Sequence, residues 1–126
     1  MIIIDTHVLL WTLYDSSFLS QEAKIAISDN PRCVSIASLW EMSIKQAIGK
    51  LKVPQSIIEI ADICKKAKID ILPISPEHCQ RIQSLPDFHS DPFDRIIIAQ
   101  SLVEGWPLVT HDWKIRKGYP EVNIIW

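Results

Sequence analysis

The sequence has few of the residues that build disulfide frameworks, zinc sites or nucleotide-binding loops. No Cys-x-x-Cys pair occurs, and the cysteines are odd in number and widely spaced, which favours reduced, mostly buried thiols. The glycines are also far apart, so neither Gly-x-Gly-x-x-Gly nor Gly-x-x-x-x-Gly-Lys is present, and a nucleotide cofactor loses its main support. The residues concerned are Cys33, Cys64 and Cys79, and Gly49, Gly105 and Gly118.

Long apolar runs and a charge excess are missing as well. The opening MIIIDTHVLLWTLYD has no basic segment and meets Asp5 after the apolar run Ile2–Ile4, and no uninterrupted apolar stretch approaches the length that spans a membrane. We therefore expect a soluble, cytoplasmic protein with no membrane partner. The formal net charge of −2 gives no overall basic surface, so any nucleic-acid binding would depend on a local patch.

Apolar β-branched runs alternate with helix-like segments along the chain. With 126 residues, 48% of them hydrophobic, the chain fits a single domain covering residues 1–126. The alternation predicts an α/β domain with a central, mainly parallel five-stranded sheet flanked by helices. The expected strands are Ile2–Ile4, Cys33–Ile36, Ile69–Ile74, Pro107–Val109 and Val122–Ile125. The expected helices are His7–Tyr14, Ser20–Asp29, Ser38–Gly49, Gln55–Ala67, Pro76–Leu85, one from Pro92 that stops at Gly105, and a turn at Trp113–Lys117.

The segment His89–Ser101 (HSDPFDRIIIAQS) places two carboxylates at the start of an apolar helix. Asp91 has the features of an N-cap, since Pro92 fits the first helical position, where no N–H is missed. Asp94 then shares a helix face with Ile97 and points toward the buried side. Two interpretations stay open at this stage: Asp94 closes a capping box, or it is a metal ligand at the edge of a pocket.

A second acid belongs to the expected helix Ser38–Gly49. Ser38 is the expected N-cap, and Glu41, three residues later, can complete a capping box with it. The helix carries one apolar stripe, a pattern more often found in a core than at a binding surface. The stripe consists of Trp40, Ile44, Ala47, Ile48 and Leu51.

Four acids are expected at one edge of the sheet. In open parallel sheets, ligands bind beyond the carboxyl ends of the strands, where Asp5 and Asp112 leave the first and fourth strands. Glu41 and Asp94 are expected at the starts of helices on the same side. Helix capping explains each acid singly, but four carboxylates in one pocket would repel each other unless a cation lay between them. Mg²⁺ or Mn²⁺ fits such oxygen ligands, and phosphodiester hydrolysis is the chemistry it would support, with one ion or two.

Other side chains near these acids are less specific. Basic residues could grip phosphates, although each is also explained as solvated surface or as a local pair such as Glu41 with Lys45. His89 and His111 flank acids and could shuttle protons or bind zinc, but their spacing matches no zinc motif. The candidate RNA contacts are Lys45, Arg95, Lys114 and Arg116. The tryptophans near the expected rim are Trp40, Trp106 and Trp113, for which a core position is the commoner role than base stacking.

Taken together, these segments resemble PIN-domain proteins, and more narrowly the VapC-type toxins of bacterial type II toxin–antitoxin pairs. The resemblance covers essentially the whole chain through IIIDTHVLLW, SIASLWEMSIKQAIGKL, HSDPFDRIIIAQS and PLVTHD. The Asp-Pro-Phe-Asp-Arg run before an apolar helix is its most specific part, whereas the opening segment alone is weak.

The resemblance implies a three-layer PIN fold and Mg²⁺- or Mn²⁺-dependent endoribonuclease activity. It also implies a homodimer and inhibition by a cognate antitoxin protein. By position, it implies that the metal-binding and catalytic acids are Asp5, Glu41, Asp94 and Asp112, with Thr6, Asp91 and Thr110 in supporting positions. The alternative is a catalytically silent PIN-like module that binds protein or RNA.

Overall fold

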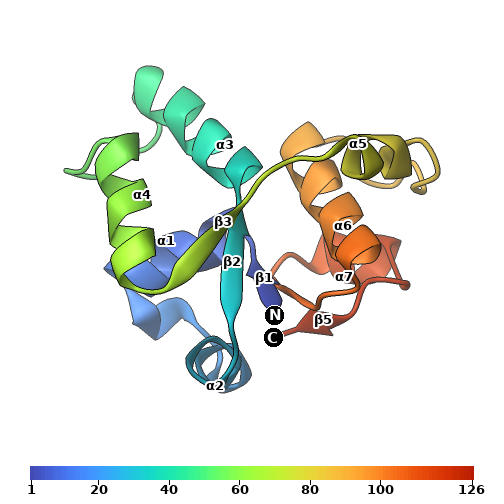
Figure 1. Cartoon of the computed structure of the whole chain (residues 1–126), viewed down its shortest axis with the longest axis horizontal. Coiled ribbons are helices and arrows are strands. Elements are labelled where there is room, and N and C mark those ends of the chain that lie inside the picture. The colour runs from blue at the N-terminus through green and yellow to red at the C-terminus, as the bar shows by residue number, and fades with distance from the viewer.

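The computed structural model describes residues 1–126 and has the predicted α/β architecture (Figure 1). One five-stranded sheet runs through the molecule in the order β3-β2-β1-β4-β5, and every neighbouring pair of strands is parallel. The prediction of a central parallel sheet is therefore confirmed. The strands are β1 Ile2–Ile4, β2 Arg32–Ser35, β3 Ile69–Leu72, β4 Leu108–Val109 and β5 Ile124–Ile125.

Helices cover both faces of the sheet and make three layers. Figure 1 shows α1, α2 and α4 on one side of the strands and α5, α6 and α7 on the other. The helices are α1 Thr6–Tyr14, α2 Gln21–Asp29, α3 Ile36–Ala47, α4 Ile57–Lys66, α5 Pro76–Ile82, α6 Pro92–Glu104 and α7 Trp113–Gly118, with a 3₁₀ turn, η1, at Ser16–Phe18. No helix is long and apolar enough to cross a membrane.

The sheet separates two hydrophobic cores because side chains alternate between its faces. Along β1, Ile2 and Ile4 pack with α1, α2, α3 and α4, whereas Ile3 packs with α6 and α7. All three side chains are buried, which explains why the strand is apolar throughout instead of alternating. Cys33 and Cys64 are free and buried in these cores, whereas Cys79 is free and exposed.

The strand order creates a switch point at the centre of the sheet. From β1 the chain builds β2 and β3 on one side, and it then returns to place β4 and β5 on the other. Ile4 is in register with Val109, and the Asp5 N–H donates to the Val109 carbonyl at 3.1 Å. The residues that follow β1 and β4 therefore lie side by side, where open parallel sheets form ligand sites.

The start of α3 differs from the prediction. β2 ends at Ser35, and the helix begins at Ile36, so Ser35 is the N-cap and accepts from the Ala37 N–H at 3.0 Å. Ser38 is not a cap, because it lies inside the helix, where its buried hydroxyl accepts from the Thr6 hydroxyl at 2.8 Å. Glu41 is consequently beyond the first turn of α3 and cannot complete a capping box with Ser38.

The apolar stripe of α3 is also corrected. The helix buries Leu39 and Met42 in the core. Of the predicted stripe, Leu51 lies beyond the helix and is partly buried against the core, and the other members are exposed. Four side chains spaced by four residues remain exposed, and we call them the α3 stripe. They are Ile36 at 38%, Trp40 at 59%, Ile44 at 42% and Ile48 at 60% exposure.

Candidate metal centre

A cleft of about 330 Å³ lies at the carboxyl edge of the sheet, beside the switch point. It brings together all four acids that were expected at one rim. Two of them belong to the segments that follow β1 and β4, and two belong to α3 and α6. The lining residues are Asp5, Thr6, His7, Trp11, Glu41, Lys45, Asp91, Asp94, His111 and Asp112.

Asp5 is the deepest acid on the β1 side of the cleft. It is the N-cap of α1, since its Oδ1 accepts from the Val8 N–H at 2.8 Å. Burial raises the pKa of its carboxyl group, and hydrogen bonds from the Thr110 hydroxyl and the Val8 N–H partly oppose that rise. The fold thus holds the Asp5 carboxyl group where burial disfavours its charge, and hydrogen-bond donors contact only part of that group.

Glu41 is 8% exposed and has one oxygen without a partner. Its Oε2 forms an ion pair with the Lys45 Nζ at 3.0 Å, the local pair considered from the sequence, whereas Oε1 is buried and accepts no hydrogen bond. A buried carboxylate oxygen without a donor is unfavourable. This oxygen belongs to a residue that lines the cleft, so a cation bound there would supply what it lacks.

Asp94 is a second acid of the cleft whose pKa is raised. Burial is the main cause that raises its pKa to about 7, and the neighbouring carboxylates of Asp91, Glu41 and Asp5 raise it further, while His89 lowers it. Asp91 is the N-cap of α6, as predicted, and its Oδ1 accepts from the Phe93 N–H at 2.9 Å. The Asp94 side chain does not close a capping box and instead turns to His89.

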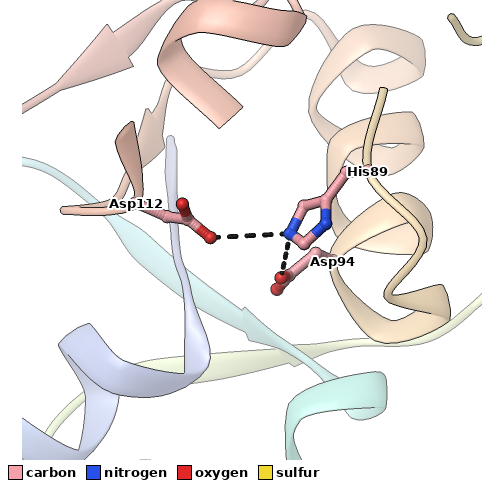
Figure 2. Close-up of side chains that lie close together, drawn as sticks. All are labelled: His89, Asp94 and Asp112. Carbon is pink, nitrogen blue, oxygen red and sulfur yellow. Dashed lines mark hydrogen bonds and ion pairs between the residues drawn. The ribbon is translucent and has the colours of Figure 1, made fainter. Parts of the chain in front are cut away.

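His89 lies between two of the acids (Figure 2). Its Nε2 is 2.8 Å from Asp94 Oδ2 and 3.5 Å from Asp112 Oδ2, and the side chain is 11% exposed. The ligand atoms of these three residues all lie within 4.8 Å of one another. The sequence predicted that His89 flanks the acids and could shuttle protons or bind zinc, but no motif places a loop histidine between two helix N-termini.

Arg95 fixes the loop that carries His89. Its guanidinium donates to the Pro86 carbonyl at 3.0 Å, to the His89 carbonyl at 3.3 Å and to the Tyr119 hydroxyl at 3.2 Å. That hydroxyl also accepts from the His89 N–H at 3.1 Å. Arg95 does not line the cleft, and these contacts hold the loop, while the RNA contact predicted for Arg95 stays a prediction.

The remaining predicted residues divide between the cleft and its surroundings. Lys45 lines the cleft, whereas Lys114 and Arg116 are exposed on α7 and lie outside it. Thr110 accepts from the Asp112 N–H at 3.1 Å, which ties the end of β4 to the N-cap of α7. Among the tryptophans, Trp11 lines the cleft, and Trp40, Trp106 and Trp113 do not. Trp11 was missed because it lies in an apolar helix segment typical of a core.

The cleft fits a hard divalent cation. It offers carboxylate oxygens, which Mg²⁺ and Mn²⁺ prefer. Two further observations agree: the Glu41 Oε1 has no donor, and like charges together with burial raise the pKa of Asp94. By position, Asp5, Glu41, Asp94 and Asp112 are the residues that would hold the ion.

The fold and the cleft together define a class: parallel α/β domains with an acidic site at the switch point of the sheet. Comparison with known proteins narrows this class. The family model of the PIN domain matches residues 2–119. The chain therefore belongs to the PIN domain family, which confirms the resemblance seen in the sequence.

Individual relatives agree with this assignment. The chain is 27% identical over 135 residues to Ribonuclease VapC22 of Mycobacterium tuberculosis, with 99% of this chain and 98% of that protein covered. Its fold is similar to that in VapBC2 from Rickettsia felis bound to a promoter DNA fragment, with a TM-score of 0.71, 17% identity, and 98% and 97% of the two chains covered. VapBC-1 from nontypeable Haemophilus influenzae gives a TM-score of 0.68 at 18% identity, with 98% and 96% covered.

The raised pKa of Asp94 predicts a pH-dependent stability. The folded state holds the Asp94 proton more tightly than the unfolded chain does, so the free energy of unfolding falls as the pH rises from 3.8 to about 7. Asparagine cannot ionise, yet it keeps an oxygen for His89. We expect metal-free Asp94→Asn to be more stable than the wild type by about 2 kcal/mol near pH 8, with the difference vanishing near pH 4.

Urea unfolding in the presence of a chelator, over this pH range, measures the effect. Asp62→Asn, at an exposed acid on α4, is the matched control and should follow the wild type. Added Mg²⁺ should raise the melting temperature of the wild type but not that of Asp94→Asn. Equal stability of Asp94→Asn and the wild type at every pH would show that neither burial nor the neighbouring acids disfavour the charge of Asp94.

Proposed function

We propose that the protein is a metal-dependent endoribonuclease and the toxin of a type II toxin–antitoxin pair. The observation that carries this proposal is the convergence of four carboxylates in one cleft, with one buried oxygen, Glu41 Oε1, lacking any donor. The name of the relative Ribonuclease VapC22 supports RNA as the substrate. The alternative, a catalytically silent binding module, does not account for the unfavourable concentration of acids.

The proposed roles follow from the positions of the side chains. Asp5, Glu41, Asp94 and Asp112 would hold Mg²⁺ or Mn²⁺, and a divalent ion there would supply water activation and neutralise charge on the RNA phosphate. Thr110 orients Asp5 and the N-cap of α7 through its hydroxyl.

Three further residues assist this site. Asp91 raises the negative potential beside Asp94, and Thr6 anchors the start of α1 to α3 through Ser38. Lys45, at the rim, can contact a phosphate once the ion satisfies Glu41. Lys114 and Arg116 extend the positive charge along α7, outside the cleft.

The proposed partners are a cognate antitoxin and a second copy of the chain, in the cytoplasm and as a single domain of residues 1–126. VapBC complexes among the solved structures of similar fold support the antitoxin. The α3 stripe supports the homodimer. It continues into an apolar hollow of about 250 Å³, where Trp40 meets Phe93 edge to face at 5.0 Å. Exposed aromatic and aliphatic side chains in one continuous patch are typical of protein interfaces.

Cleavage of RNA tests the proposed activity. Purified protein should cut a mixed single-stranded RNA with Mg²⁺ or Mn²⁺ and lose all cutting in a chelator. Asp94→Asn and Asp5→Asn should lower the rate by at least about a hundredfold, because each removes a ligand charge, while Asp62→Asn should cut like the wild type. Unchanged cutting by Asp94→Asn would exclude the acidic cleft as the active site. Metal binding without cutting of any RNA would favour the binding module.

Growth of the host tests the toxin assignment. Expression of the wild type should arrest growth, and expression of Asp94→Asn should not. The product of a small gene next to this one should restore growth and block RNA cleavage when mixed with the purified protein. Arrest that Asp94→Asn produces equally well would show that toxicity does not depend on the nuclease cleft.

The mass of the protein in solution tests the homodimer. Light scattering should give twice the chain mass for the wild type and the single-chain mass for Ile44→Glu, because a charge in the α3 stripe would be buried on association. Ile25→Glu is the matched control, since Ile25 is 51% exposed on α2 and lies outside the stripe. A dimeric Ile44→Glu would exclude this surface as the dimer interface. A monomeric wild type would contradict the homodimer and favour the antitoxin as the partner that covers the α3 stripe.

A further inference from the structure

Five aromatic side chains gather beside the acidic cleft, and we call them the aromatic cluster. Trp11 is its centre. Its ring is stacked with His7 at 5.8 Å and with Phe18 at 5.7 Å between centroids, and it meets His111 edge to face at 5.9 Å. Trp126 completes the cluster, at 5.8 Å from Trp11 and 4.9 Å from His111.

The cluster forms one wall of the same cleft that holds the acids. His7, Trp11 and His111 all line the cleft, and Trp11 is its one hydrophobic lining residue. The rings and the acids come from the same chain segments: His7 follows Asp5 at the start of α1, and His111 precedes Asp112 after β4. A molecule that lies over the acids therefore meets aromatic rings at the side.

Core packing accounts for Trp11 and Trp126, which are partly buried against the core, but not for the other three rings. The His7 and His111 side chains are exposed, and Phe18 is 60% exposed, so the cluster has rings at the surface on several sides of Trp11. Aromatic surface left in water beside charged carboxylates gains little unless a ligand covers it. A flat, uncharged π-system attached to an anionic group would suit both halves of the cleft, the π-system through the rings and the anionic group through a cation held by the acids.

A nucleotide has that chemistry. We propose that the aromatic cluster binds one unpaired nucleobase of the RNA by stacking, so that the phosphodiester bond next to that base lies over the acids. The proposal rests on the proposed ribonuclease function and deepens it. Every base has a π-face, so the cluster would accept several bases, whereas a base inside a duplex is already stacked on its neighbours. The preferred substrate is therefore a single-stranded segment or a loop.

Abasic substitution in the substrate tests the proposal. In a short single-stranded RNA with one cleavage site, each nucleotide in turn is replaced by a ribose without a base. The wild type should lose about tenfold or more in kcat/KM when one position next to the cut lacks its base, and much less at the others. No sensitivity at any position, with normal cutting of the intact RNA, would overturn the stacking site and leave the ribonuclease standing.

Variants of the cluster identify the rings responsible. Trp11→Leu should cut the intact RNA about tenfold less efficiently and should no longer respond to the missing base, because the two changes remove the same contact. Tyr14→Leu, at an exposed aromatic residue on α1 that does not line the cleft, is the matched control and should keep the full response. A Trp11→Leu variant that still responds to the missing base would contradict the proposal.

Binding measurements separate stacking from cleavage and from folding. Asp94→Asn protein should bind the intact RNA more tightly than the abasic RNA, and adding His7→Leu, at an exposed ring, should reduce that difference without lowering the melting temperature. If the wild type cuts no RNA yet this difference appears, the ribonuclease fails and the stacking site stands. If Asp94→Asn binds both RNAs equally, the stacking site fails whatever the wild type cuts.

Discussion

Repulsion among buried carboxylates is the constraint on which the rest of this structure depends. Asp5 and Asp112 are N-caps, and Asp94 lies in the first turn of α6, so three of the four acids lie at helix N-termini, where free N–H groups and the positive end of the helix dipole favour negative charge. Glu41 is the exception inside a helix, and Lys45 one turn away provides its charge partner. The helices that surround the sheet thus offset part of the repulsion, and the repulsion that remains adds to the effect of burial in raising the pKa of Asp94.

His89 opposes part of the rise in the pKa of Asp94. The His89 ring lies between the carboxylates of Asp94 and Asp112. Its backbone is held by the Tyr119 hydroxyl, which accepts from the His89 N–H, and by Arg95, which donates to the His89 carbonyl. Arg95 adjoins Asp94 in the sequence, but it faces the opposite way, toward the carbonyl groups of the loop. Asp94 and Arg95 are adjacent on α6 but differ in role, since Asp94 lines the cleft and Arg95 holds the loop that carries His89.

The sequence predicted those parts of the fold and site that depend on local patterns. The strands, the N-cap at Asp91 and the meeting of four acids follow from apolar runs, turn residues and the geometry of parallel sheets. The start of α3 was wrong because Ser35 and Ser38 are both good caps, and only the pairing of β2 with β3 up to Ser35 decides between them. His89 could not be placed, since its position depends on contacts from α6 and from Tyr119, thirty residues further along the chain.

The α3 helix shows why the strongest amphipathic pattern need not mark the core. Leu39 and Met42 bury one face of α3 in the core. The more regular stripe of Ile36, Trp40, Ile44 and Ile48 faces outward, although leaving it in water is unfavourable for an isolated chain. An exposed apolar stripe with regular spacing is typical of a surface that another protein chain covers in a complex. The same helix also carries Glu41, whose position on the helix lies beside the stripe, so whatever covers the stripe lies close to the acidic cleft.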